Sequence, residues 1–170
     1  IIPVYNNYLS LPTLLNQLDS LNNTLKKNLE VVFVVDGSPD ESYQFLCKNL
    51  PQKFFTSKLI LLSRNFGAFA AIEAGIFNAS GEFFAVVAAD LQDPIDVTIK
   101  FFSNLETDQF DIVIGVRSSR GDPFLSRFFA NLYWKLYKKY IQKDLPLGGV
   151  DFYGFNSKFK DQLITLKESS

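Results

Sequence analysis

The chain has 170 residues, of which 47% are hydrophobic and 15% aromatic, and its formal net charge is -1. This length and apolar content suffice to bury one sizeable core. We therefore expect a single domain over residues 1–170, with further residues belonging to it at one or both ends. The near-zero charge argues against a general attraction to nucleic acid. A single cysteine argues against a disulfide scaffold and favours a reducing, cytoplasmic compartment.

Apolar, β-branched runs alternate along the chain with segments of helical period. We expect strands at residues 1–5, 30–35, 58–62, 83–89 and 111–116. Helices are expected at residues 11–25, 41–50, 68–78, 94–105 and 158–166, with Ser10 as the N-cap of the first. Strict alternation of strand and helix predicts right-handed crossovers, and hence an α/β fold with a mainly parallel central sheet.

The segment 124–143 is aromatic and basic, and it has two interpretations. One is an interfacial helix that lies on anionic lipid as a peripheral membrane contact. The other is a core helix with a solvated basic face, because apolar residues occupy much of its circumference. Both interpretations stay open from the sequence.

Polar residues follow the ends of the first three predicted strands. Tyr5 offers a ring for stacking on a planar base, or fills a turn. Asp36 offers a carboxylate to a base or ribose, or closes a turn while Asp40 caps the next helix. Arg64 faces a phosphate or carboxylate in one interpretation, and Gly67 only begins a helix in the other.

The fourth strand ends at a cluster of oxygen ligands. The uncharged run 83–89 stops at Asp90, Gln92 and Asp93. Hard divalent cations prefer such oxygens, and usually bind through one or two protein carboxylates plus substrate phosphates. Asp90 and Gln92 therefore predict a metal site, whereas Asp93, just before Pro94, is expected to cap the following helix. The chain has no histidine, so any catalytic base must be a carboxylate, Lys, Tyr or thiolate.

Four motifs carry a family resemblance: Pro3-Val4-Tyr5-Asn6, Val35-Asp36-Gly37-Ser38-Pro39-Asp40, Ser63-Arg64-Asn65-Phe66-Gly67 and Asp90-Leu91-Gln92-Asp93-Pro94. In this order and spacing they resemble the family 2 glycosyltransferases, and most of all the dolichyl- and polyprenyl-phosphate sugar transferase branch. The resemblance covers essentially the whole chain.

The resemblance implies a GT-A fold, which is a Rossmann-like three-layer α/β/α arrangement. It implies an inverting transferase that moves a sugar from a nucleotide-diphosphate sugar to a polyprenyl phosphate or glycan acceptor in cell-envelope synthesis. Mg²⁺ or Mn²⁺ would bridge the donor phosphates, and the enzyme would work in the cytoplasm or at the inner face of the cell membrane. By position, the nucleotide would be bound by Pro3, Tyr5, Val34 through its backbone, Asp36, Ala89 and Asp90, and the metal by Asp90 and Gln92.

Three further residues take their roles from the resemblance alone. Arg117 matches an arginine near the donor phosphates, and Arg127 matches a second basic position for a donor or acceptor phosphate. Asp151 is the candidate general base, which takes the acceptor's proton during inversion. With a phosphate acceptor it would mainly orient groups, and the alternative is an Asp that caps a helix or closes a loop.

The chain departs from the family pattern at three positions. Ala88 replaces the first carboxylate of the usual acidic pair, Val35 replaces the first of two consecutive aspartates, and Asn7 replaces a common acidic residue. We therefore expect metal to bind appreciably only with the donor diphosphate, and a catalytically impaired nucleotide-sugar-binding protein is the alternative function. A nicotinamide oxidoreductase is disfavoured, because no Gly-x-Gly-x-x-Gly follows the first strand.

Overall fold

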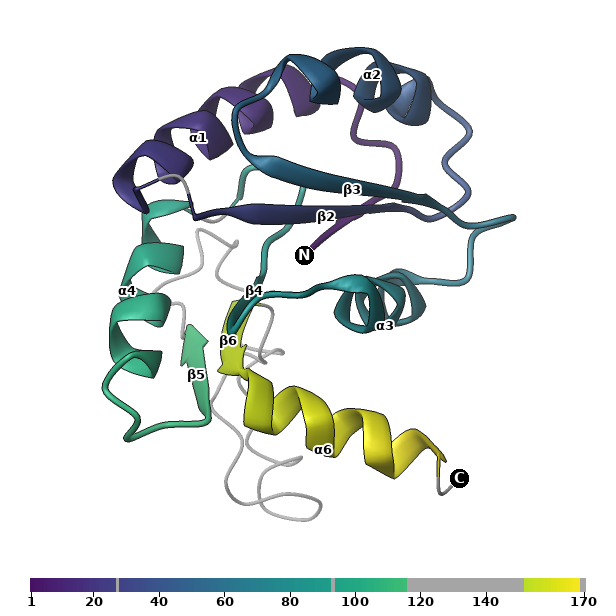
Figure 1. Ribbon diagram of the computed structural model, residues 1–170. Helices are drawn as coiled ribbons and strands as arrows, with labels where there is room; N and C mark the ends of the chain where they lie inside the picture. Colours follow the sequence, from purple (N-terminus) through teal and green to yellow (C-terminus); the bar gives the residue numbers. More distant parts are fainter. Residues whose placement is uncertain (27, 93, 116–151, 169–170) are drawn as a thin grey trace, which may run out of the picture.

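The computed structural model describes residues 1–26, 28–92, 94–115 and 152–168 (Figure 1). Its elements are β1 (Ile2–Val4), α1 (Leu11–Thr24), β2 (Glu30–Val35), α2 (Ser42–Asn49), a 3₁₀ turn (Leu50–Gln52), β3 (Thr56–Leu61), α3 (Ala68–Asn78), β4 (Phe83–Val86), α4 (Asp96–Leu105), β5 (Ile112–Gly115), β6 (Phe152–Asn156) and α6 (Ser157–Glu168). The strand predicted at 30–35 and the helix predicted at 68–78 match β2 and α3 to the residue, whereas the strand predicted at 83–89 is shorter.

The first three strands form a parallel sheet in the order β1-β2-β3. β2 is buried from Val31 to Val35, as expected for a strand covered on both faces. Val35 pairs with Val4 on one side and Leu61 on the other, so the carboxyl ends of the three strands lie side by side at one end of the sheet. The polar residues predicted at their ends therefore leave the sheet together.

A second sheet has the order β4-β6-β5, in which β6 runs antiparallel to both neighbours. The sequence does not predict β6, because the strand is short and has Gly154 at its centre, and glycine weakens strands. Here the glycine is required by packing. A Cβ at Gly154 would lie 3.0 Å from the Phe84 carbonyl oxygen and 3.1 Å from the Phe101 Cβ. The expectation of parallel strands thus holds for β1 to β3 but not for β6.

The two sheets meet where β1 passes β4. The Ile1 nitrogen donates to the Ala85 carbonyl at 2.8 Å, and the Val87 amide donates to the Ile1 carbonyl at 3.0 Å. The segment that follows β4 is therefore carried to the same edge as the loop after β1.

Helices cover the sheet on both faces, which confirms the predicted three-layer α/β/α arrangement (Figure 1). Val31, Phe33 and Val35 of β2 pack with α1, α2 and α4. Val32 and Val34, which point the other way, pack with α3 and α6. On α1 the buried residues are Asn22 and five of the leucines predicted to face the core, namely Leu11, Leu14, Leu15, Leu18 and Leu21.

Four predicted functional residues and the aromatic, basic segment 124–143 lie outside the described residues. The four are Asp93, Arg117, Arg127 and Asp151, and what was predicted for them stays a prediction. Among the residues that the structure describes, none of the helices has both the length and the apolar character needed to cross a membrane.

Candidate functional site

A cavity of about 320 Å³ opens at the carboxyl ends of β1, β2 and β4. It is lined by five of the residues predicted to bind a nucleotide: Pro3, Tyr5, Asp36, Ala89 and Asp90. These residues come from three separate strand ends. The structure therefore brings most of the predicted nucleotide site to one place, which is the usual position of ligands in open α/β sheets.

Two predicted site residues do not line this cavity. Val34 is fully buried inside β2, between Pro3 and Ile60 on the neighbouring strands. Its backbone contact with a nucleotide stays a prediction. Gln92 is exposed just beyond the cavity, two residues after Asp90.

Six further residues that line the cavity have no predicted role in nucleotide binding: Val4, Asn7, Asn65, Gly67, Ala68 and Ala88. Asn65 and Gly67 belong to the motif Ser63-Arg64-Asn65-Phe66-Gly67, and this motif is the sequence signal that points to them. Asn7 and Ala88 stand out as departures from the family pattern. Val4 and Ala68 carry no polar side chain, and nothing in the sequence marks them.

The Asp36 carboxylate binds the loop that precedes α3. Its Oδ1 accepts the Phe66 N–H at 2.8 Å, and its Oδ2 accepts the Gly67 N–H at 2.8 Å. Asp36 is only 3% exposed, so these two bonds satisfy a carboxylate that would otherwise be costly to bury. The prediction that Asp36 only closes its own turn is too narrow, because its partners lie in another loop.

Gly37 allows that loop to pass close above the end of β2. A Cβ at Gly37 would lie 2.3 Å from the Arg64 carbonyl carbon, and the residue has a φ of +57°. Both the contact and the left-handed backbone favour glycine. The Arg64 guanidinium does not line the cavity but stacks on the Phe66 ring, 4.3 Å from its centroid.

The loop after β1 is fastened to the loop after β2 by two side chains. The Ser38 hydroxyl accepts the Asn6 N–H at 2.8 Å, and Asp40 Oδ2 accepts the Tyr8 N–H at 3.0 Å. Asp40 Oδ1 also accepts from the Ser38 hydroxyl at 2.6 Å and from the Ser42 N–H at 3.1 Å. Asp40 thus binds the start of α2, although the N-cap residue is Glu41 and not Asp40.

These hydrogen bonds set the charge state of Asp40. Partial burial by itself would raise the pKa of this carboxyl. The bonds donated by Ser38, Tyr8 and Ser42 outweigh that effect and lower the pKa from 3.8 to about 2. The carboxylate therefore keeps its charge, and its hold on the loop, through the whole neutral and mildly acidic range.

Tyr5 lies in the loop that is held in this way. Its side chain is 43% exposed, and its N–H donates to the Asn7 Oδ1 at 2.9 Å. Asn6 between them has a φ of +55°, a left-handed conformation that asparagine tolerates better than most residues. The loop thus has a defined shape before any ligand binds.

Asp90 and Gln92 form a compact turn at the exposed end of the cavity. Asp90 Oδ1 accepts the Gln92 N–H at 3.1 Å, and Leu91 between them has a φ of +63°. A carboxylate and a carboxamide are suitable ligands for Mg²⁺ or Mn²⁺. The described part of the chain has no group of three or more His, Cys, Asp or Glu residues that could hold a metal. Asp90 and Gln92 therefore fit an ion that takes its remaining ligands from phosphates and water.

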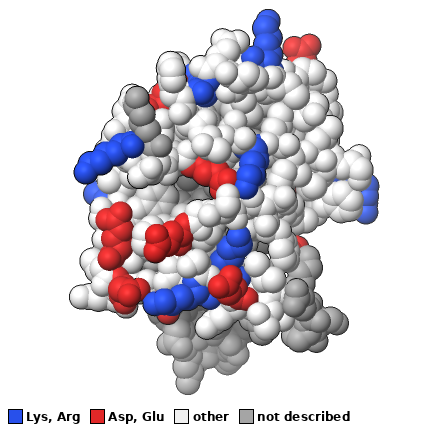
Figure 2. Space-filling view, in the orientation of Figure 1, with Lys and Arg blue, Asp and Glu red and all other residues white. Residues whose placement is uncertain are grey.

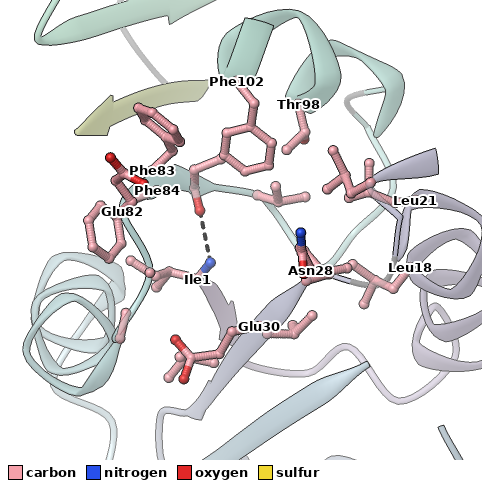
Figure 3. Close-up of a pocket in the computed structure, with 18 of the residues that line it drawn as sticks. Ile1, Leu18, Leu21, Asn28, Glu30, Glu82, Phe83, Phe84, Thr98 and Phe102 are labelled. Carbon is pink, nitrogen blue, oxygen red and sulfur yellow. Dashed lines mark hydrogen bonds between the residues drawn. The ribbon is translucent and has the colours of Figure 1, made fainter. Parts of the chain in front are cut away.

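A larger cavity, of about 380 Å³, opens at the opposite edge of the sheet, where the strands begin (Figure 3). Leu18, Leu21 and Phe102 line it, and its ionisable side chains are carboxylates, including Glu30 and Glu82. None of its lining residues is Lys or Arg. The face seen in Figure 2 carries interspersed acidic and basic side chains around a central hollow. Because none of the predicted site residues lines this cavity, the one at Asp90 is the better candidate for a nucleotide site.

Comparison with known sequences gives one family and several relatives. The profile described as "Glycosyl transferase family 2" matches residues 1–164. The uncharacterized glycosyltransferase YkcC of Bacillus subtilis is 32% identical over the whole of this chain and 52% of its own length. An undecaprenyl-phosphate 4-deoxy-4-formamido-L-arabinose transferase of Klebsiella pneumoniae is 28% identical, again over the whole chain and 52% of its own length. The chain thus spans about half the length of these curated relatives.

Comparison with solved structures identifies the fold as GT-A. The mannosyltransferase PcManGT from Pyrobaculum calidifontis, solved with GDP-Man and Mn²⁺, matches with a TM-score of 0.64 at 18% identity, over 95% of this chain and 45% of the other. Glucosyl-3-phosphoglycerate synthase from Mycobacterium tuberculosis, solved with UDP, matches with a TM-score of 0.62 at 16% identity, over 92% and 55%. At these identities the likeness concerns the fold alone.

Proposed function

The chain belongs to glycosyl transferase family 2, and from this premise we propose that it is an inverting, metal-dependent transferase. It moves a sugar from a nucleotide-diphosphate sugar to a polyprenyl phosphate or a glycan, in cell-envelope synthesis. The observation that carries the proposal is the single cavity lined by Tyr5, Asp36 and Asp90, which come from three strand ends.

Pro3, Tyr5 and Asp36 bind the base and the ribose. The exposed Tyr5 ring offers a face on which a base can stack. Each Asp36 oxygen already accepts one backbone N–H, but a carboxylate oxygen has a second lone pair for a donor on the ligand. The loop before α3, whose amides Asp36 binds, therefore does not have to open for the nucleotide to bind.

Asp90 and Gln92 would hold Mg²⁺ or Mn²⁺ next to the donor diphosphate. When bound, the ion would neutralise the negative charge that develops on the departing nucleoside diphosphate. Because Ala88 supplies no second carboxylate, the protein ligands are few, and metal binds appreciably only with the donor diphosphate. The Mn²⁺ bound with GDP-Man in PcManGT supports a divalent ion in this fold.

Three residues outside the described part of the chain complete the reaction. Arg117 and Arg127 bind phosphates, and Asp151 accepts the acceptor's proton. The acceptor oxygen attacks the anomeric carbon from the face opposite the nucleotide, which inverts the configuration. These roles rest on the family resemblance alone. With a phosphate acceptor, which needs little deprotonation, Asp151 mainly orients the attacking group.

A polyprenyl phosphate is the acceptor best supported by the relatives. Two relatives named undecaprenyl-phosphate 4-deoxy-4-formamido-L-arabinose transferase, both from Klebsiella pneumoniae, match the whole of this chain at 28% identity. We propose that the protein works in the cytoplasm, at the inner face of the cell membrane, and that the segment 124–143 contacts lipid. Cosedimentation with anionic liposomes tests that contact. Binding that falls as salt rises is expected, and no binding at low salt would refute it.

A nucleotide-sugar-binding protein without catalysis is the second candidate. Ala88 and Val35 favour it, because both replace carboxylates of the family pattern. Binding tests alone do not separate the two candidates. A transfer and donor-hydrolysis assay does, since the second candidate binds a donor tightly with metal and turns over none.

A thermal-shift screen of UDP- and GDP-sugars, with and without Mn²⁺, tests the proposed function. A ligand at about 100 times its Kd adds about 2.7 kcal/mol of stability. We expect one donor class to raise the Tm only with Mn²⁺, and Asp90→Asn to remove that shift. The matched control is Asp96→Asn, which changes an exposed carboxylate in the first turn of α4. Stabilisation by no donor would contradict the proposal.

A further inference from the structure

One hydroxyl group, that of Ser10, joins two of the loops at the cavity. Its Oγ donates to the Ala89 carbonyl oxygen at 2.6 Å and also lies 2.9 Å from the Asn7 carbonyl oxygen. Ser10 occupies the N-cap position of α1, as the sequence predicts, but its side chain makes no capping hydrogen bond. A serine at this position normally bonds an amide in the first turn. Here it bonds a residue that is 79 positions away.

The two loops have different roles in the proposed function, on which this inference rests. Asn7 belongs to the loop that carries Tyr5, whereas Ala89 directly precedes Asp90. Ala89 is 3% exposed, so water does not readily replace the Ser10 hydroxyl at its carbonyl. Beyond Ala89 the turn is closed by the bond from Gln92 to Asp90. A displacement of Ala89 would therefore move both predicted metal ligands together.

We propose that Ser10 is a positioning residue. It couples the loop that carries Tyr5 and Asn7 to the turn that carries Ala89 and Asp90, and it contacts neither the nucleotide nor the metal directly. By holding the Ala89 carbonyl, it fixes Asp90 relative to the loop that binds the base, so that a bound diphosphate and the Asp90 carboxylate reach the same ion. Nothing in the sequence motifs assigns this role to Ser10.

Calorimetric titration of UDP and GDP at increasing Mn²⁺ concentrations tests the coupling. Ser10→Ala should raise the Mn²⁺ concentration for half-maximal nucleotide binding about two- to tenfold, the cost of one hydrogen bond. It should leave the nucleotide affinity in EDTA nearly unchanged. Ser10→Thr keeps the hydroxyl and should restore the wild-type requirement. An unchanged Mn²⁺ requirement in Ser10→Ala would overturn the proposal.

Ser20→Ala is the matched control. The Ser20 hydroxyl also donates to a backbone carbonyl, that of Asn16 at 3.2 Å, but both residues lie in α1. Removing this hydroxyl deletes a comparable hydrogen bond on the same helix without touching the cavity. We expect wild-type nucleotide and Mn²⁺ binding, and a changed Mn²⁺ requirement here would overturn the assignment to Ser10.

Hydrogen–deuterium exchange on the nucleotide-free protein gives a readout that does not depend on the proposed function. In Ser10→Ala the amides of residues 90–92 should exchange several-fold faster, while those within α1 keep their wild-type rates and report an intact helix. If the wild type shows no metal-dependent nucleotide binding, the proposed function fails. Exchange then decides on Ser10 alone: faster exchange at 90–92 supports its hold on the loop, and unchanged exchange refutes it.

Discussion

The Asp36 carboxylate holds the amide of Gly67, which lies 31 positions further along the chain, at 2.8 Å from Oδ2. Gly67 is the residue from which α3 starts, and the second oxygen of Asp36 binds the adjacent amide of Phe66. A side chain expected to bind a nucleotide therefore also determines where a helix begins. Changes at Asp36 should affect both the fold and the site.

Asp36→Asn should lower the free energy of unfolding by about 1–3 kcal/mol, because the new NH₂ group cannot accept a backbone N–H and would itself be a buried donor facing one. Urea unfolding measures the change. The control is Asp108→Asn, whose carboxylate forms an exposed ion pair with Lys158 at 3.1 Å. It should cost much less than Asp36→Asn, because solvent screens the exposed pair. Equal losses in the two variants would contradict the role given to Asp36.

Alanine at Gly37 should destabilise the protein more than alanine at Gly67. Both glycines have positive φ, +57° and +95°, so each substitution carries backbone strain of roughly 1–3 kcal/mol. Only at Gly37 does the new Cβ also meet backbone, 2.3 Å from the Arg64 carbonyl carbon, whereas the space at Gly67 is open. Thermal unfolding of the two variants compares them, and an equal loss would show that the loop yields freely above Gly37.

The Asp40 carboxylate should make stability depend on pH in the acidic range. Its pKa is lowered from 3.8 to about 2 in the folded protein, so it contributes stability above the unfolded value that is lost as pH falls from 3.8 towards 2. Asp40→Asn lacks this contribution. The difference in unfolding free energy between wild type and variant should therefore shrink over that range, and a constant difference would argue against the lowered pKa.

The sequence predicts the parts of the fold that depend on local pattern. β2 is an uninterrupted apolar run after Glu30, and α3 has clear signals at both ends, so both are found to the residue. The family resemblance assigns Tyr5, Asp36 and Asp90 to one nucleotide site, and the structure brings the three residues to one cavity. Predictions of this kind need no knowledge of which side chains touch.

What the sequence misses depends on contacts between distant segments. β6 owes its place between β4 and β5 to pairing with both, and Gly154 alone would argue against a strand. The sequence predicts Ser10 as an ordinary N-cap, because no neighbouring residue indicates that its hydroxyl bonds the Ala89 carbonyl. The two amides bound by Asp36 are likewise visible only once the loop before α3 is folded over Gly37.

Ala88→Asp should restore the missing carboxylate and let metal bind without nucleotide. Ala88 lines the cavity two residues before Asp90. A second carboxylate there should raise the Mn²⁺ affinity of the nucleotide-free protein on the order of tenfold, since affinity rises with the number of charged ligands. Calorimetry measures it, with Ala68→Asp as a control that adds the same charge to the cavity from α3. A similar gain in both variants would indicate attraction by charge alone.

Calorimetric titration of UDP and GDP, with Mn²⁺ or with EDTA, into the wild-type protein and Asp90→Asn tests the central claim most directly. We predict that one nucleotide binds the wild type on the order of tenfold or more tightly with Mn²⁺. Asp90→Asn should bind it equally weakly in both conditions. Binding of equal strength in Mn²⁺ and EDTA, or an Mn²⁺ effect that survives in Asp90→Asn, would contradict a metal-bridged nucleotide at this cavity.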